Sequence, residues 1–244
     1  MTDEPLDEPA ENISGGPSGG GEHTPSERAD APTTRAEAVV DELGEMYWQK
    51  AYGGQAAFEC LVRTILSQNT SDKASQPAHD SLMARYGGDG DLAESLADAE
   101  QDELAETIAS AGLYNQKSET IIRLANRVRQ EYGSAAGFDG FVKTAEPAEV
   151  RDALLEMKGV GPKTADCVLL FSGGRSGVFP VDTHVHRIAR RMGLAPPDAD
   201  HEEVREAIEA AVPPEKCGFG HTAMIQFGRE YCTARKPACL EGPE

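Results

Sequence analysis

Lysine is scarce in this sequence of 244 residues, and the basic residues are far outnumbered by acidic ones. There are 23 Lys+Arg against 42 Asp+Glu, for a formal net charge of −19, and only 8 of the basic residues are lysine. Because phosphate affinity comes largely from Lys and Arg, this balance argues against a nucleic-acid partner. It also fits a protein adapted to a very salty cytoplasm, where a Debye length of about 3 Å screens global repulsion of DNA. An ordinary acidic protein has the same composition, so both interpretations stay open.

Long apolar runs and a secretion signal are absent as well. No run approaches the roughly 18 apolar residues that a membrane helix needs, and no signal-peptide pattern opens the chain. The five cysteines have no secretory context, which argues against a disulfide framework. We therefore expect a cytoplasmic protein with no membrane partner.

Alternating strand patterns are also hard to find, and the best short extended piece is 177–181. Residues 1–35 are rich in Gly, Pro, Ser and acids and predict a disordered tail. After that, apolar residues recur at helical spacing, first at Val39, Leu43 and Met46. A second stripe consists of Phe58, Leu61, Val62, Ile65 and Leu66. The sequence predicts an all-α fold with further helices near 71–86, 102–111, 116–132, 147–158, 162–171, 183–192, 201–211 and 217–230.

The most informative segment is 154–166, where two apolar helical stretches meet at Gly159-Val160-Gly161. Two glycines one residue apart let backbone amides approach a phosphate, and the restarting helix aims its positive N-terminus at that anion. A bare Gly-x-Gly is more often only an interhelical turn. However, Lys163 lies in the first turn of the second helix, and Asp182 follows nineteen residues later. This combination suggests amine chemistry on nucleic acid.

Several segments, in order, resemble the helix-hairpin-helix DNA glycosylases, and most closely the endonuclease III branch in its archaeal form. The hairpin at about 154–171 is followed by Val-Asp-Thr-His at 181–184. Ile-Leu-Ser-Gln-Asn-Thr-Ser-Asp at 65–72 resembles the substrate-pocket segment of the family, and Gly-Leu-Tyr-Asn-x-Lys at 112–117 resembles its next helix start. The segment 229–239 resembles the opening of an iron–sulfur loop.

The resemblance implies two helical domains that flank a DNA-binding cleft. One would be a six-helix unit over 50–175, and the other would combine 36–49 with 176–244. It further implies a bifunctional DNA glycosylase/AP lyase of base-excision repair that removes oxidised pyrimidines. We expect a monomer acting on double-stranded DNA that carries a damaged base or an abasic site, with the damaged nucleotide flipped into the cleft.

Lys163 matches the catalytic lysine of the family and Asp182 its catalytic aspartate. An amine can attack C1′, expel the base and form a Schiff base that leads to β-elimination. Because a free lysine is mostly protonated, we expect burial and the helix N-terminus to lower its pKa. Asp182 would help to deprotonate the amine and stabilise positive charge on the sugar, and it also suits a helix N-cap.

Four further positions are expected to bind DNA through the resemblance. Gly159 and Gly161 would offer backbone N–H groups to a phosphate, which positions DNA without reading its sequence. Gln68 or Asn69 would fill the gap left by the flipped nucleotide, and the sequence does not distinguish between them. Each of these polar residues could instead satisfy a helix end.

The stretch after Asp182 is rich in basic residues. His184 and His186 with Asp182 form a ligand-like cluster, but on a helix the two histidines point to different faces, which disfavours a metal site. The basic stripe Arg187, Arg190 and Arg191 is equally consistent with DNA-backbone contact and with a solvated helix face. We take Arg187 as the candidate for DNA binding.

The cysteines depart most clearly from the family pattern. A [4Fe–4S] centre there takes four cysteines spaced C-x6-C-x2-C-x5-C. Cys232 and Cys239 keep the first interval, but position 242 is glycine, so only two of the four expected ligands are present. Either the sequence stops short of the last two ligands or the cluster has been lost. Cys60 and Cys167 fit core thiols.

Three rival functions remain. The nearest is a monofunctional mismatch glycosylase that removes thymine or uracil, and Lys163 argues against it because such relatives typically lack the lysine. A non-catalytic helix-hairpin-helix module would only grip DNA and would have no use for Asp182. A metal-dependent hydrolase built on His184 and His186 is the most distant.

Overall fold

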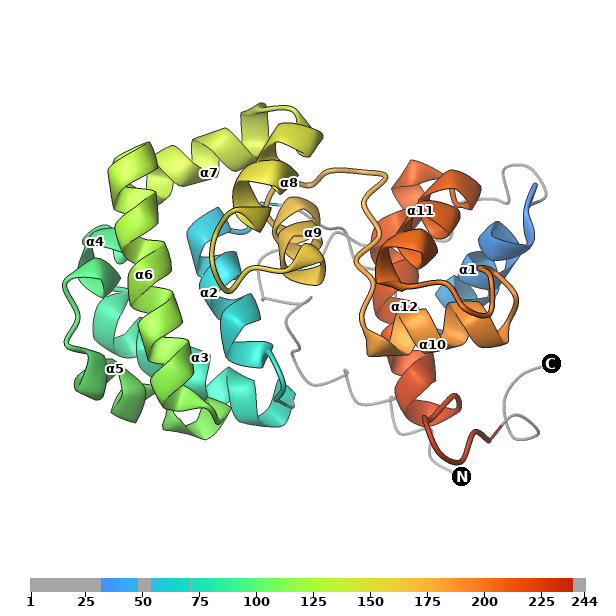
Figure 1. The fold of residues 1–244 in the computed structure, drawn as a ribbon, viewed down its shortest axis with the longest axis horizontal. Coiled ribbons are helices and arrows are strands. Elements are labelled where there is room, and N and C mark those ends of the chain that lie inside the picture. The colour runs from blue at the N-terminus through green and yellow to red at the C-terminus, as the bar shows by residue number, and fades with distance from the viewer. Residues whose placement is uncertain (1–31, 48–53, 71, 239–244) are drawn as a thin grey trace, which may run out of the picture.

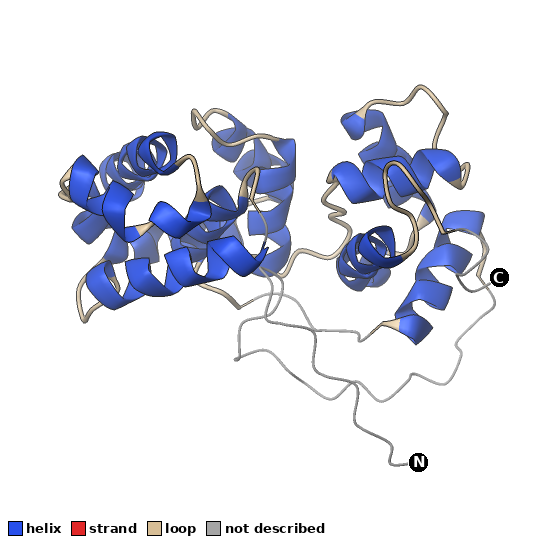
Figure 2. Cartoon of the chain, turned by 90° about the horizontal axis from the view of Figure 1, so that it is seen from below, coloured by secondary structure: helices blue, strands red, loops and turns tan. Residues whose placement is uncertain are grey.

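The computed structural model describes residues 32–47, 54–70 and 72–238. In these ranges every regular element is a helix, which confirms the all-α prediction (Figure 2). The predicted tail lies almost entirely outside the described residues. Among those described, no helix is both long enough and apolar enough to cross a bilayer. The elements are α1 (Arg35–Met46), α2 (Ala57–Ser67), α3 (Asp72–Tyr86), α4 (Leu92–Ala97), α5 (Gln101–Thr107), η1 (Ala109–Ala111), α6 (Tyr114–Tyr132), α7 (Ala135–Thr144), α8 (Pro147–Leu155), α9 (Pro162–Phe171), α10 (Thr183–Arg191), α11 (His201–Ala211), η2 (Pro214–Lys216) and α12 (Cys217–Glu230).

The first hydrophobic core belongs to α2–α9 and is organised around α2. The predicted stripe on α2 is buried at every position, from Phe58 at 1% exposure to Leu66 at 0%. Helix α2 packs against α3, α6, α7 and α9, so it has no solvent face along most of its length. This central position holds α9 in place.

The second core joins α1 to the C-terminal helices α10, α11 and α12. Figure 1 shows these four helices together on the right, with α1 in blue beside helices from the other end of the sequence. The predicted face of α1 is only partly right, because Leu43 is buried and Val39 is half-buried against this core, whereas Met46 is 38% exposed and the unpredicted Val40 is fully buried.

The backbone corrects two of the predicted helices. The expected helix 102–111 is divided, because Ile108 leaves helical geometry between α5 and η1. Helix α8 ends at Leu155, three residues before the predicted end, and the following residues form the turn into the hairpin. The short extended piece 177–181 has no regular secondary structure and connects the two cores.

Candidate functional site

The loop between α8 and α9 requires glycine at its first glycine position. Gly159 has φ +103°, and a Cβ there would lie 2.7 Å from Cγ2 of Thr120. Gly161 has φ −104°, and a Cβ there would meet no atom within 4 Å. Hence the fold demands Gly159, whereas Gly161 leaves an open approach to the backbone from outside.

That open approach leads to the N-terminus of α9. Gly161 is its N-cap, and no side chain accepts a hydrogen bond from the first turn. Pro162 supplies a fixed φ at the first helical position. A helix start without a side-chain cap presents N–H groups and the positive end of the helix dipole, which together suit an anion.

Lys163 follows directly and lines a pocket of about 230 Å³ between the two cores. Gln68 and Thr164 contribute from the first core, and Val181 and His201 from the side of the second. The lysine is partly buried. The pocket therefore contains a primary amine within reach of a group that enters between the cores.

The pKa of Lys163 is shifted upward, so the predicted lowering is wrong. Burial acts to lower it, but Cys167 and the carboxylate of Asp182 act to raise it and outweigh burial. Burial also raises the pKa of the Cys167 thiol, so at neutral pH that sulfur is uncharged and Asp182 is the relevant negative charge. The resting amine is an ammonium and must lose a proton before it can attack a carbon.

Asp182 is the N-cap of α10. Its Oδ1 accepts hydrogen bonds from the backbone N–H groups of His184 and Val185, both at 2.8 Å. Both capping hydrogen bonds are accepted by Oδ1, and neither involves Oδ2. Asp182 can therefore cap the helix and still act as the predicted catalytic carboxylate.

Gln68 and Asn69 occupy different surroundings. The Gln68 side-chain amide donates to the carbonyl of Gly159 at 3.1 Å and to Oγ1 of Thr164 at 3.2 Å, which connects the end of α2 to the hairpin. Asn69 has φ +52°, in the left-handed region that most side chains avoid. Gln68 therefore braces the pocket, and Asn69 lies on a strained turn beside it.

A second strained residue was not identified from the sequence as a site residue. Leu113 has φ +49° and is 55% exposed, which is unusual for a large apolar side chain. Thr70 donates to the carbonyl of Ala111, which connects the Asn69 turn to the Leu113 turn. In the sequence, only Gly112, directly before this leucine, indicated a turn here. The exposure and the positive φ of Leu113 depend on the fold and are seen only in the structure.

Buried Lys117 stabilises both of these turns. Its Nζ donates to the carbonyls of Leu66 at 2.6 Å and Ala111 at 2.9 Å. Burial lowers its pKa to about 8. An ammonium held between two carbonyls fixes the end of α2 against η1, and so fixes the strained pair Asn69 and Leu113.

The histidines after Asp182 do not form a metal centre. Among the described residues, no group of three or more His, Cys, Asp or Glu side chains could hold a metal ion. The Nδ1 atom of His184 lies 3.0 Å from Nη2 of Arg187, and the His186 ring stacks on His201 with centroids 4.1 Å apart. The separation predicted for the two histidines is consistent with these contacts.

Arg187 makes four contacts inside its own chain. Its guanidinium donates to the carbonyls of Cys232, Thr183 and Gly228 at 2.8, 3.0 and 3.2 Å, besides the contact with His184. Arg191 similarly donates to the carbonyls of residues 233 and 234. The structure thus places Arg187 where it holds the C-terminal loop, and its assignment to DNA binding stays a prediction.

The cysteines described here do not make up an iron–sulfur site. Cys232 is 9% exposed, and its Sγ lies 3.4 Å from Nη1 of Arg191. Cys60 and Cys167 are buried in the first core and Cys217 in the second. Cys239 lies outside the described residues. Of the two cysteines that match the family spacing, only Cys232 is among the described residues, so that part of the chain holds one of the four ligands that a [4Fe–4S] cluster takes.

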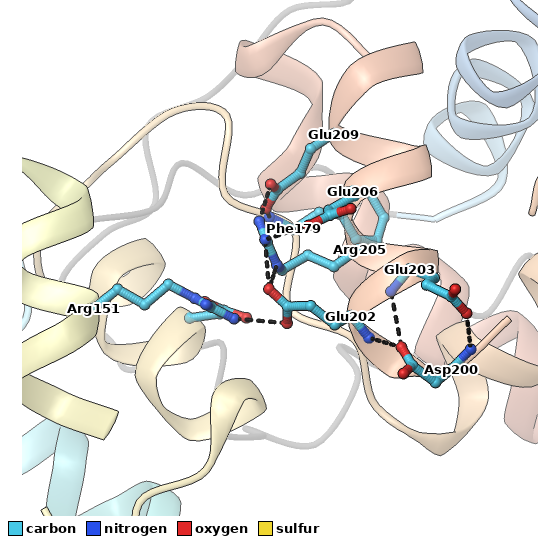
Figure 3. A network of polar contacts seen from close by, with 9 residues as sticks. Arg151, Phe179, Asp200, Glu202, Glu203, Arg205, Glu206 and Glu209 are labelled. Carbon is cyan, nitrogen blue, oxygen red and sulfur yellow. Dashed lines mark hydrogen bonds and ion pairs between the residues drawn. The ribbon is translucent and has the colours of Figure 1, made fainter. Parts of the chain in front are cut away.

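A network of charges crosses between the cores beside the pocket, and no sequence pattern predicted it. Arg151 of α8 donates to Asp166 at 2.7 Å and to Glu202 of α11 at 2.9 Å. Glu202 also accepts from Arg205 at 2.6 Å, and Arg205 pairs with Glu209, as Figure 3 shows. We call these five residues the clasp. Because Asp166 is only 2% exposed, the clasp is anchored in the protein interior.

The chain is similar to known proteins over most of its length. Residues 62–214 match the family described as HhH-GPD superfamily base excision DNA repair protein. Endonuclease III of Thermotoga maritima is 32% identical over 184 residues, covering 75% of this chain and 78% of the relative. Endonuclease III of Bacillus subtilis is 30% identical over 210 residues, covering 85% and 88%. A solved structure described as a trapped endonuclease III–DNA covalent intermediate aligns with TM-score 0.69 at 28% identity, covering 84% of this chain and 90% of that one.

Proposed function

Since the chain belongs to the HhH-GPD superfamily of base excision DNA repair proteins, we propose that it is a bifunctional DNA glycosylase and AP lyase. The observation that carries this proposal is the amine of Lys163 in a pocket between the cores, with Asp182 close enough for its charge to act on it. We further propose that 50–175 and 36–49 with 176–244 form the two domains.

Lys163 acts as the nucleophile. Its neutral amine attacks C1′ of the flipped deoxyribose, the glycosidic bond breaks, and the base leaves with its bonding electrons and acquires a proton. Ring opening gives an iminium between Nζ and C1′. Loss of the C2′ proton then breaks the C3′–O bond, and the strand is cleaved 3′ to the lesion.

Asp182 prepares and supports this step. Its carboxylate is the negative charge beside Lys163, so it stabilises positive charge that develops on the sugar as the base departs. The same carboxylate can accept the ammonium proton once DNA excludes water from the pocket. Its hydrogen bonds as the N-cap of α10 fix the position of the carboxylate relative to the amine of Lys163.

The DNA backbone is held by the hairpin. The uncapped start of α9 and the open side of Gly161 let a phosphate reach backbone N–H groups. Gly159 shapes the turn that presents them. These contacts are independent of sequence, as a repair enzyme requires.

The strained pair Asn69 and Leu113 enters the duplex. An exposed apolar side chain can insert between bases and compensate part of the unstacking cost, which is a few kcal/mol. Asn69 would face the unpaired base while Gln68 braces the pocket wall. The hydrogen bonds of Lys117 hold Asn69 and Leu113 in these backbone conformations before DNA binds.

The preferred substrates we propose are oxidised pyrimidines and abasic sites. The competing proposal is the monofunctional removal of thymine or uracil from mismatches. The position of Lys163 in the pocket favours the first, because hydrolysis by water alone has no need of an amine there.

Borohydride trapping on an abasic-site duplex tests the proposal. Wild-type protein should form a covalent adduct, because borohydride reduces the iminium to a stable amine. Lys163→Gln should form none, whereas Lys158→Gln, which changes an exposed lysine in the same loop, should trap at the wild-type rate. An adduct that survives in Lys163→Gln would remove this lysine from its role. Base release by the wild type without any adduct would support the monofunctional alternative.

A further inference from the structure

A hollow of about 380 Å³ lies beside α10 and shares no lining residue with the pocket that contains Lys163. We call it the arginine hollow. Three guanidinium groups around one concave surface suit an anion, although the chain as a whole has a net charge of −19. None of its lining residues is acidic, and they are His186, Arg187, Arg190, Arg191 and Pro197.

The positive charges of the arginine hollow are not cancelled by carboxylates. Among the described residues, none of the three arginines forms an ion pair with Asp or Glu. Arg187 and Arg191 donate mainly to backbone carbonyls, and Arg190 donates through Nε to the carbonyl of Pro197 at 2.5 Å. A carbonyl fixes a guanidinium without neutralising it, so the hollow keeps three positive charges in fixed positions.

Arg190 has the largest remaining capacity to bind a ligand. Arg187 donates from Nε, Nη1 and Nη2, and Arg191 donates from Nη1 and Nη2. Arg190 is exposed and donates from Nε alone, so its Nη1 and Nη2 groups have no partner in the described part of the chain. Two neighbouring N–H donors in one plane match two oxygens of a phosphate.

A stacked pair of histidines separates the arginine hollow from the pocket. His186 lines the hollow and His201 lines the pocket, and their rings stack with centroids 4.1 Å apart and planes within 1° of parallel. The Nε2 atom of His186 lies 2.9 Å from the carbonyl oxygen of Ala199, which connects α10 to the loop before α11. The hollow therefore borders the pocket on the side of the second core, whereas Gly161 of the hairpin borders it on the side of the first.

We propose that the arginine hollow binds a backbone phosphate of the damaged DNA strand, with Arg190 as the main contact. The strand is then held on both sides of the flipped nucleotide, by the start of α9 on the first core and by the hollow on the second. This inference rests on the proposed function, which places that nucleotide in the pocket. Because the net charge of −19 gives no general attraction to DNA, affinity has to come from local contacts of this kind.

Binding to duplexes that carry one neutral phosphate tests this inference. Each duplex contains a non-cleavable tetrahydrofuran site, and a methylphosphonate replaces the phosphates near that site on the same strand, one in each duplex. Kd is measured for wild type, Arg190→Gln and Arg190→Lys over a range of salt concentrations, with the melting temperature as a check of folding. Arg85→Gln is the control, because it removes an exposed arginine of α3, which lines neither the pocket nor the hollow.

We expect two separate phosphates to matter for the wild type, one at the hairpin and one at the arginine hollow. A methylphosphonate at either position should weaken binding about tenfold, the usual effect of losing a hydrogen bond to a charged group. Arg190→Gln should weaken binding of the unmodified duplex by a similar factor and reduce the slope of log affinity against log salt by about 1. It should also become insensitive to the second methylphosphonate while it stays sensitive to the first. Arg190→Lys should keep the wild-type salt slope, and Arg85→Gln should match wild type throughout.

Two results would overturn the inference. If Arg190→Gln stayed sensitive to both methylphosphonates, the arginine would act through general attraction and not through one phosphate. If the wild type were sensitive only at the hairpin and still trapped on an abasic site, the proposed function would stand and the hollow would not bind the strand. This second result needs no variant to fold. A wild type that neither bound these duplexes nor trapped on an abasic site would refute the proposed function and this inference with it.

Discussion

Asp182 and Asp200 cap helices in the same way, as Asp91 does at α4, but of the two only Asp182 interacts with the amine of Lys163. Asp182 accepts hydrogen bonds from two backbone N–H groups at the start of α10, and Asp200 does the same at the start of α11. Capping alone therefore explains the geometry of both residues. What distinguishes Asp182 is its electrostatic interaction with Lys163, whose pKa it raises.

The comparison gives a matched test of Asp182. Asn caps helices as well as Asp, so Asp182→Asn and Asp200→Asn should both keep the wild-type melting temperature within a few degrees. Asp182→Asn should lower the pKa of Lys163 by removing a negative charge, yet slow trapping about 100-fold or more through loss of proton transfer and charge stabilisation. Asp200→Asn should trap normally. If Asp182→Asn trapped faster at neutral pH, the only effect of the carboxylate would be to keep the amine of Lys163 protonated, and the proposed catalytic role of Asp182 would be wrong.

The sequence locates Lys163 and Asp182 but not the direction of the lysine pKa. The helix N-terminus and burial, both readable from sequence, act to lower that pKa. The opposing charge at neutral pH comes from Asp182, which lies near the amine only because α9 packs beside the chain that precedes α10. Leu113 illustrates the same limit, since its exposure and its positive φ depend on the packing around η1.

At the scale of elements, the two glycines of the hairpin have different roles. The fold requires glycine at position 159, whereas the proposed DNA contact requires glycine at position 161. A Cβ at Gly159 would collide with Thr120, and its φ is unfavourable for any other residue. A Cβ at Gly161 would occupy open space, so the folded chain tolerates it. The two positions therefore report on different properties of one loop.

We predict opposite effects for the two alanine variants. Gly159→Ala should destabilise the protein by about 1–3 kcal/mol, the usual range for a residue held in an unfavourable backbone region. Gly161→Ala should keep wild-type stability but weaken DNA binding, because its methyl group would stand where a phosphate approaches the N–H groups of α9. Thermal unfolding and Kd for an abasic-site duplex measure the two effects. Normal DNA binding by Gly161→Ala would show that the phosphate is held elsewhere.

The predicted elements were right where an apolar stripe was long. The stretches 162–171, 201–211 and 217–230 match α9, α11 and α12 to the residue. Helices α4 and α7 were missed because α4 has only 6 residues and α7 carries two glycines, so neither offers a clear period. Their helical form depends on contacts with α6, which are tertiary and not local.

At the scale of the whole molecule, two kinds of charge interaction coexist. The net charge of −19 repels across the surface and is screened by salt. The clasp is different, because Asp166 is 2% exposed and Arg151 is 19% exposed, so solvent ions reach this pair poorly. Burial raises the pKa of Asp166 while Arg151 acts against that rise, which shows how strongly the carboxylate depends on its partner.

These two interactions predict different responses to salt. Raising KCl from about 0.1 M to about 2 M should increase wild-type stability, because screening removes repulsion among the excess carboxylates. Arg151→Met should cost about 3 kcal/mol at both concentrations, since it leaves a buried carboxylate unpaired. Arg85→Met is the control, because its pair with Glu103 is exposed at both ends and should contribute less than about 1 kcal/mol.

Denaturant unfolding of the three proteins at both salt concentrations measures these responses. Screening must raise all three stability values together, because the surface repulsion is common to them. The difference between wild type and Arg151→Met must stay constant, because the pair it removes lies away from solvent ions. If salt closed that difference, the clasp would behave as a surface ion pair and would not hold the two cores at the pocket. If wild-type stability fell with KCl, the acidic surface would not be an adaptation to a salty cytoplasm, and the interpretation as an ordinary acidic protein would stand.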